Sequence, residues 1–211
     1  MIFSVIIAIA IGYLLGSIPF AYITGRLVKG VDIRQVGGGN MGALNAVREI
    51  GLLPGLTVLI ADIGKGSLAV LIANWLGLPL IWIFIAGFAA VVGHNWPIFL
   101  RFKGGKGAAT TLGVLFALTP GEFAISLAIM VVVIIITSNV RLAIVVGLVF
   151  LPLIIWRFNG SVMLITYSLA LPFFLLIRSL PTTREAVANI GDKKGLIFDR
   201  DYHFWQTKKS K

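Results

Sequence analysis

The chain has 211 residues, of which 58% are hydrophobic and 12% charged, with 18 Lys and Arg against 8 Asp and Glu. Soluble domains carry roughly 25% charged residues, so this composition excludes a water-soluble globular protein and indicates a membrane protein. The net charge of +10 does not indicate nucleic-acid binding, which needs a solvated basic face, and the absence of cysteine excludes disulfides and thiolate chemistry.

Seven apolar segments come near the roughly 20 residues that a membrane-spanning helix needs. The first segment has no basic region before it, as a signal peptide would, so we expect it to stay in the membrane with the N-terminus outside. The sequence Ser17-Ile18-Pro19 near its end predicts a break in the helix. The predicted spans lie at about 2–24, 53–75, 79–99, 105–119, 121–138, 141–157 and 161–178.

The fourth segment is short, and a re-entrant hairpin is the alternative to a crossing. With seven crossings, 16 of the 18 Lys and Arg residues fall on one side, which agrees with the positive-inside tendency. The charges therefore predict an all-α polytopic membrane protein with seven transmembrane helices and a cytoplasmic C-terminus. We expect a transmembrane catalytic domain at 1–180 and a basic cytoplasmic tail at 181–211.

The loop after the first span is rich in glycine, with Gly37-Gly38-Gly39 followed by Asn40 and Gly42. Glycine adopts positive φ readily, so such a loop can turn several N–H groups toward one point and bind a phosphate. Interleaved asparagine and arginine side chains would add donors and charge. The alternative is a flexible connector between two spans.

Two charged residues, Asp62 and Lys65, lie within the second span with i,i+3 spacing, which places them on one helical face. Charged groups inside a bilayer are costly and mark functional sites by default, but a self-neutralising pair that stabilises helix packing is the interpretation favoured here. Gly64 and Gly66 beside them, and Gly16 in the first span, would permit close approach of helices.

The second basic loop places Lys103 and Lys106 around two glycines at the start of the fourth segment. Ammonium groups and backbone N–H groups at a helix N-terminus favour an anion, whereas a positive-inside anchor would explain the lysines but not the glycines. His94 precedes this loop. It is either a structural hydrogen-bonding group or a catalytic or phosphate-positioning residue, and it has no neighbouring ligands for a metal site.

Taken together, the two loops resemble the bacterial integral-membrane acyl-phosphate:glycerol-3-phosphate acyltransferase family. Its first motif, Gly-Ser-x-Pro followed by a glycine-rich loop, is matched at residues 16–19 and 37–45. Its second motif, Gly-His-x-x-Pro-x-Phe followed by Phe-Lys-Gly-Gly-Lys-Gly, is matched at residues 93–99 and 102–107. Two hydroxyl residues of the first loop are replaced by Gly38 and Leu44, and the third motif is echoed only by Asn189-Ile190.

The resemblance and the residue chemistry together define the expected site. Catalytic roles are expected of Lys106, His94, Asn45 and Ser17. Phosphate and substrate binding is expected of Arg34, Gly37, Gly38, Gly39, Asn40, Gly42, Arg48, Lys103, Gly104, Gly105, Gly107, Thr110 and Asn189. Neither a metal nor a cofactor is expected.

The resemblance implies that an acyl group moves from acyl phosphate to the 1-hydroxyl of sn-glycerol 3-phosphate, which gives lysophosphatidic acid and phosphate in phospholipid biosynthesis. It also implies a bacterial cell inner membrane location, with the active site on the cytoplasmic side, contact with membrane lipids and functional coupling to a soluble enzyme that makes acyl phosphate. The alternative is a transporter or permease for a phosphorylated anion. A permease often has duplicated halves, and the two loops differ in sequence, which counts against it.

Overall fold

The computed structural model describes the backbone of residues 1–188 and the side chains of residues 1–180. All regular secondary structure in this part of the chain is helical, which confirms the all-α prediction for it. Most of the predicted tail at 181–211 lies outside the described residues.

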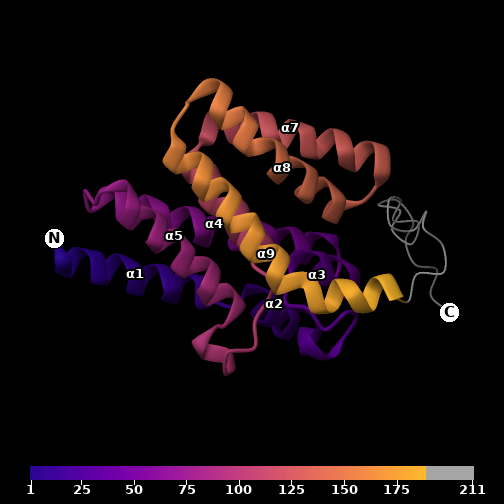
Figure 1. The fold of residues 1–211 in the computed structure, drawn as a ribbon. Helices are drawn as coiled ribbons and strands as arrows, with labels where there is room; N and C mark the ends of the chain where they lie inside the picture. Colours follow the sequence, from indigo (N-terminus) through magenta and orange to yellow (C-terminus); the bar gives the residue numbers. More distant parts are fainter. Residues whose placement is uncertain (189–211) are drawn as a thin grey trace. The chain divides into compact units, whose positions relative to one another are not determined.

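The chain divides into two compact units, residues 1–120 and residues 121–211, and each is described by itself. The first unit holds five longer helices, one short helix and two 3₁₀ turns (Figure 1). They are α1 (Ile2–Ser17), α2 (Phe20–Lys29), η1 (Ile33–Gln35), α3 (Ala43–Glu49), α4 (Leu52–Trp75), α5 (Leu80–Asn95), η2 (Ile98–Leu100) and α6 (Ala108–Leu118).

The first apolar segment is broken where the sequence predicts a break. Helix α1 ends at Ser17, and Pro19 precedes α2, because a proline inside a helix would remove a hydrogen bond and clash with the preceding turn. Helix α2 ends at Lys29 and is capped by Gly30, which adopts the left-handed conformation with φ 68°. The break places the Ile18 carbonyl within reach of a side chain from another helix.

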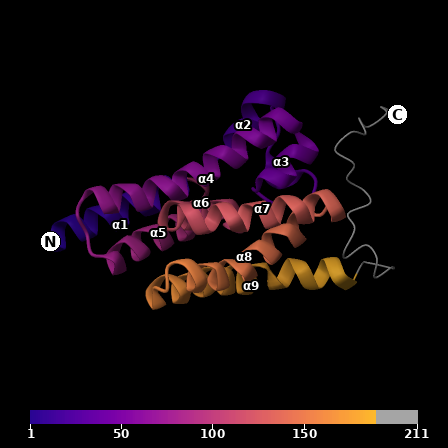
Figure 2. The same ribbon diagram turned by 90° about the horizontal axis from the view of Figure 1, so that it is seen from above.

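Glycines allow α1 to pack closely against α5 (Figure 1) and α4 to pack closely against α6 (Figure 2). A Cβ atom on Gly16 would collide with the backbone of Ala90, and one on Gly66 would collide with the backbone of Thr110. The position of a Cβ on Gly64 has no such neighbour within 4 Å, so the packing role predicted for Gly64 is wrong.

The second unit contains α7 (Pro120–Thr137), α8 (Val140–Phe158) and α9 (Val162–Ala188). Helices α8 and α9 run side by side (Figure 2). Helix α7 contacts α8 where the Ser126 hydroxyl donates a hydrogen bond of 2.8 Å to the Gly147 carbonyl. A buried hydroxyl that finds an acceptor across a helix pair is a common contact between membrane helices.

Six helical segments of the described chain are long and apolar enough to cross a membrane, so the protein is a multi-span integral membrane protein. They correspond to six of the seven predicted spans and are Ile2–Lys29, Leu52–Trp75, Leu80–Leu100, Pro120–Thr137, Val140–Phe158 and Val162–Leu180. The span predicted at 105–119 contains only the 11 residues of α6. At about 1.5 Å per residue this helix covers about half of a ~30 Å hydrocarbon core. A crossing at α6 therefore stays a prediction.

The packing of α4 on α6 is tested by two neighbouring glycines of α4, Gly64 and Gly66. Gly66→Ala places a methyl group against the Thr110 backbone, so we expect it to lower the free energy of unfolding by about 1–3 kcal/mol. Gly64→Ala meets no such obstacle, and we expect the same stability or a gain of about 0.5–1 kcal/mol from helix propensity. Thermal unfolding of both variants in detergent measures the difference; equal Tm values would contradict this account of the helix contact.

Candidate active site

The glycine-rich loop between α2 and α3 is held in shape by the side chain of Asn45. Its Nδ2 donates hydrogen bonds of 3.2 Å to the carbonyls of Ile33 and Val36, and its Oδ1 accepts one of 3.1 Å from the Gly38 N–H. Asn45 is 7% exposed. All three bonds go to the loop backbone, so the geometry gives this predicted catalytic residue a role in positioning the loop.

The glycines of this loop adopt the predicted conformation but do not all present their N–H groups outward. Gly37 and Gly39 have φ values of 57° and 63°, which other residues rarely adopt. The N–H of Gly39 donates to the Val36 carbonyl at 3.1 Å, and that of Gly38 donates to Asn45. These two N–H groups are therefore used within the loop, and phosphate binding by Gly38 and Gly39 stays a prediction.

The remaining predicted residues of this region lie at the end of the loop and in α3. Asn40 is half-buried, with its amide nitrogen against Gly42, where a Cβ atom would come within 3.0 Å. Arg48 is exposed in the last turn of α3. Of the two arginines predicted to bind phosphate here, Arg48 is thus the more accessible one.

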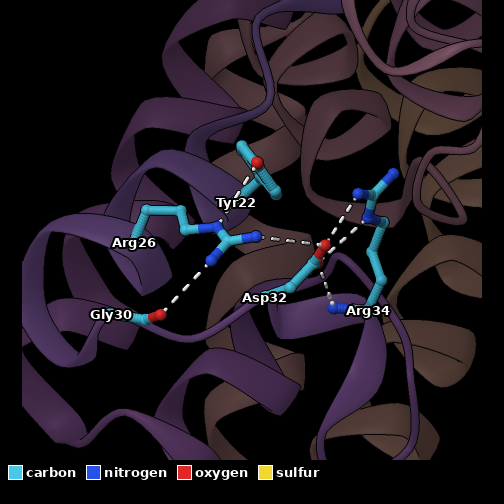
Figure 3. A network of polar contacts seen from close by, with 5 residues as sticks. All are labelled: Tyr22, Arg26, Gly30, Asp32 and Arg34. Atoms are coloured by element: carbon cyan, nitrogen blue, oxygen red, sulfur yellow. Dashed lines mark hydrogen bonds and ion pairs between the residues drawn. The ribbon is translucent and has the colours of Figure 1, made fainter.

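Arg34, the other of these arginines, belongs to a network around Asp32 (Figure 3). Its guanidinium donates hydrogen bonds of 2.7 and 3.0 Å to the two carboxylate oxygens of Asp32. Arg26 reaches the same carboxylate at 3.8 Å, and both guanidinium groups lie over the Tyr22 ring, at 5.4 Å for Arg26 and 5.1 Å for Arg34. The hydrogen bonds from Arg34 lower the pKa of Asp32 to about 2. This bidentate pair fixes the start of the loop.

The second loop sits directly on His94. The Gly105 N–H donates a hydrogen bond of 3.0 Å to the His94 carbonyl. A Cβ on Gly105 would collide with the His94 imidazole, and one on Gly104 would collide with the His94 carbonyl and the Pro97 ring. The close packing against His94 by itself explains why positions 104 and 105 are glycine.

The turn that enters this loop has an unusual backbone. Arg101 and Phe102 are exposed, are not glycine, and have positive φ values of 53° and 61°. Backbone in this region costs free energy, and such residues concentrate at functional sites. The turn brings Lys103, which is exposed, to the start of the glycine pair.

The loop ends at the N-terminus of α6. Gly107 precedes the helix with φ 87°, and Lys106, the residue before it, is half-buried. The first N–H groups of an α-helix have no partner within the helix and form the positive end of its dipole. A lysine next to this end adds a second positive charge to the region. Thr110 has no exposed surface, and its backbone lies against Gly66 of α4, so the structure places this predicted binding residue in the helix interface.

Beneath both loops lies a buried cluster of charged and titratable groups. Lys65 Nζ is 2.7 Å from Asp62 Oδ1 and donates a hydrogen bond of 3.1 Å to the Ile18 carbonyl. His94 Nδ1 lies 3.6 Å from the same carboxylate oxygen. Asp62, Lys65 and His94 are 1%, 3% and 7% exposed. The pair predicted from the i,i+3 spacing is present, but its link to His94 was missed.

Ser17 lies in the wall of a small cavity that Asp62, Lys65 and His94 also line. The structure thus brings together two predicted catalytic residues, Ser17 and His94, and adds the buried pair to them. Lys106 and Arg48 are not among the residues that line this cavity. The predicted binding residue Asn189 lies outside the described residues.

Comparison with known proteins gives a consistent result. The model of the family described as glycerol-3-phosphate acyltransferase matches residues 6–188. Glycerol-3-phosphate acyltransferase 1 of Dehalococcoides mccartyi (strain ATCC BAA-2266 / KCTC 15142 / 195) is 40% identical over 198 residues, which cover 91% of this chain and 95% of that protein. The glycerol-3-phosphate acyltransferase of Synechococcus sp. (strain CC9902) is 38% identical over 198 residues, which cover 92% and 98%.

A solved structure matches as well. The crystal structure of PlsY (YgiH), an integral membrane glycerol 3-phosphate acyltransferase, in its glycerol 3-phosphate form has a TM-score of 0.79 and 32% identity to this chain. The match covers 88% of this chain and 92% of the other.

The ion pair at the start of the first loop predicts a pH dependence. The pKa of Asp32 is lower in the folded protein than in an unfolded chain, where it is about 3.9, so the stabilising effect is present above about pH 4 and is lost as the pH falls through about 2. We expect Asp32→Asn to speed hydrogen exchange in residues 30–42 at neutral pH, and the difference from the wild type to vanish toward pH 2. Gln35→Ala, at an exposed neighbour, is the control. A difference that persists undiminished at pH 2 would contradict this role for Asp32.

Proposed function

The chain belongs to the glycerol-3-phosphate acyltransferase family, and we propose that it transfers a fatty acyl group from acyl phosphate to the 1-hydroxyl of sn-glycerol 3-phosphate. The products would be lysophosphatidic acid and inorganic phosphate. The resemblance recognised in the two loops is confirmed by the family match and by the relatives and the solved structure. The enzyme is therefore a membrane acyltransferase that acts in lipid synthesis.

The proposed mechanism rests on one observation: the second loop packs against His94 and ends at the N-terminus of α6. Lys106 directly precedes Gly107, the N-cap of α6, and the first N–H groups of a helix have no partner within the helix. A phosphate group bound there is opposed by one ammonium and several backbone dipoles that need no reorganisation when the reaction occurs. We propose this as one phosphate site of the enzyme.

A second anion has to approach the first, because acyl phosphate and glycerol 3-phosphate each carry a phosphate. Two unit charges 4 Å apart repel by about 4 kcal/mol at an effective dielectric constant of about 20. Arg48 and the loop that Asn45 holds supply the second binding surface in the proposal. The acyl chain would lie among the membrane helices while its head group stays at the interface.

The chemical step needs no protein nucleophile, since acyl phosphate is an activated donor. The hydroxyl oxygen of glycerol 3-phosphate attacks the acyl carbon, the bond from that carbon to the bridging phosphate oxygen breaks, and phosphate leaves with the electron pair. The hydroxyl proton passes to the released phosphate, so atoms and charge balance without a general base from the chain. The protein contributes by orienting the two substrates and by offsetting their charge.

We also propose that the protein lies in a bacterial cell inner membrane with the N-terminus outside and both loops on the cytoplasmic side. The positive-inside tendency supports this arrangement, with α6 as the seventh crossing and residues 1–180 acting as the catalytic domain. Acyl phosphate is reactive, and a soluble enzyme that makes it at the cytoplasmic face would supply it directly.

The topology can be tested because the chain has no cysteine of its own. Cysteines introduced at Gln35 and Asn159, both exposed, lie on opposite sides of the membrane if α6 crosses it and on the same side if it does not. We expect a membrane-impermeant maleimide to label Asn159→Cys in intact cells and Gln35→Cys only after permeabilisation. The cysteine-free wild type is the control, and labelling of both variants from one side would contradict seven crossings.

The anion site is tested by Lys106→Ala in purified protein with palmitoyl phosphate and labelled glycerol 3-phosphate. We expect the rate of lysophosphatidic acid formation to fall at least about 10²-fold, because a preorganised charge at the reacting phosphate is lost. Arg157→Ala removes one cation at an exposed position of α8 and is expected to keep wild-type activity. Unchanged turnover in Lys106→Ala would contradict the anion site. Flux of glycerol 3-phosphate into liposomes without any product would indicate a permease instead.

A further inference from the structure

The buried pair of α4 is connected to both loops that the proposed function uses. On one side, Lys65 donates to the Ile18 carbonyl at the break before α2, and its ammonium lies 5.7 Å from the centre of the Phe20 ring. Helix α2 leads from that point into the glycine-rich loop. Lys65 therefore fixes the segment from which the first loop starts.

On the other side, the Asp62 carboxylate faces His94 Nδ1 at 3.6 Å. The opposite edge of the same imidazole ring lies against Gly105, and the His94 carbonyl accepts the Gly105 N–H at 3.0 Å. The carboxylate near Nδ1 favours the tautomer with the proton on that nitrogen and orients the ring under the second loop. His94 is 7% exposed, so it supports the loop rather than presenting a free nitrogen to solvent.

Stability alone does not account for this cluster. A buried ion pair costs desolvation free energy, and well-packed apolar residues of similar volume often stabilise a fold equally well or better. Asp62 Oδ2 and Ser17 Oγ, moreover, are buried without a hydrogen-bond partner among the described residues. In a cluster with only a packing role, we would expect such buried polar groups to have hydrogen-bond partners.

We propose that Asp62, Lys65 and His94 are positioning residues, which together set the separation and orientation of the two phosphate-binding loops for acyl transfer. The inference rests on the proposed function. Asp62 is the centre of the cluster, since Lys65 and His94 both meet its Oδ1 atom and lead to different loops. The cluster acts through the loops and touches neither substrate.

This role predicts a specific kinetic effect. Each loop keeps its own phosphate-binding groups when the cluster is changed, so each substrate is still bound, but the two reacting groups are no longer aligned. Misalignment by about 1 Å costs on the order of 10²-fold in rate. We therefore expect kcat to fall while KM for each substrate changes little.

The first test is the double variant Asp62→Asn/Lys65→Met, which removes both charges together and so leaves no unpaired buried ion. We expect it to unfold near the wild-type Tm in detergent and to show kcat reduced by on the order of 10²-fold, with both KM values within about threefold of the wild type. Thr57→Val, at an exposed position of the same helix, is the matched control with unchanged kinetics. A folded double variant with wild-type kcat, or one in which only KM rises, overturns the proposal.

The second test uses His94→Gln, which leaves the Asp62 and Lys65 pair in place. This variant tests the positioning role even if the double variant does not fold. We expect kcat to fall while the pH dependence of kcat/KM keeps its wild-type shape. Loss of a limb of that profile would identify His94 as a proton acceptor, and unchanged kcat would remove it from the mechanism; either result overturns its positioning role. Absence of product from the wild type would instead refute the proposed function itself.

Discussion

One buried carboxylate connects the segments from which the candidate active site is built. Asp62 lies in the middle of α4, where its Oδ1 meets Lys65 at 2.7 Å and His94 at 3.6 Å. Through Lys65 it reaches the break between α1 and α2, and through His94 it reaches the turn that leads to α6. A charged group in a spanning helix has to be paired or solvated, so these partners cannot move apart without a large cost. These contacts connect α4 to the segments that lead into both loops.

The glycines of the two loops serve packing at least as much as they serve anion binding. Gly104 and Gly105 are required because they lie on His94, and the N–H groups of Gly38 and Gly39 are used inside the first loop. Each loop is thus preorganised by contacts with its own support. In the proposed function, the charges that face the substrates come from Lys106 and Arg48, and the first N–H groups of α6 lie next to Lys106 in the chain. A preorganised backbone suits a reaction whose main difficulty is bringing two anions together.

Much of this arrangement could be predicted from the sequence, because the bilayer imposes length and polarity on each span. The six longer spans and the break at Pro19 follow from hydropathy and from proline chemistry. Helix α3 was missed, since its residues read as part of a glycine-rich loop. The contact between Asp62 and His94 could not be predicted, because it depends on how α4 and α5 pack and not on spacing within one helix. The burial of Thr110 could not be predicted for the same reason, as it depends on the packing of α6 on α4.

A structure of the protein with glycerol 3-phosphate and a non-reactive acyl phosphonate bound tests the central claim most directly. The account predicts one anionic group at Lys106 and the first turn of α6 and the other on the side of Arg48, with the first loop still bonded to Asn45. It predicts that Asp62, Lys65 and His94 keep their mutual contacts beneath the loops and touch neither ligand. An anionic group bound within the cavity, in contact with Lys65 or His94, would contradict it.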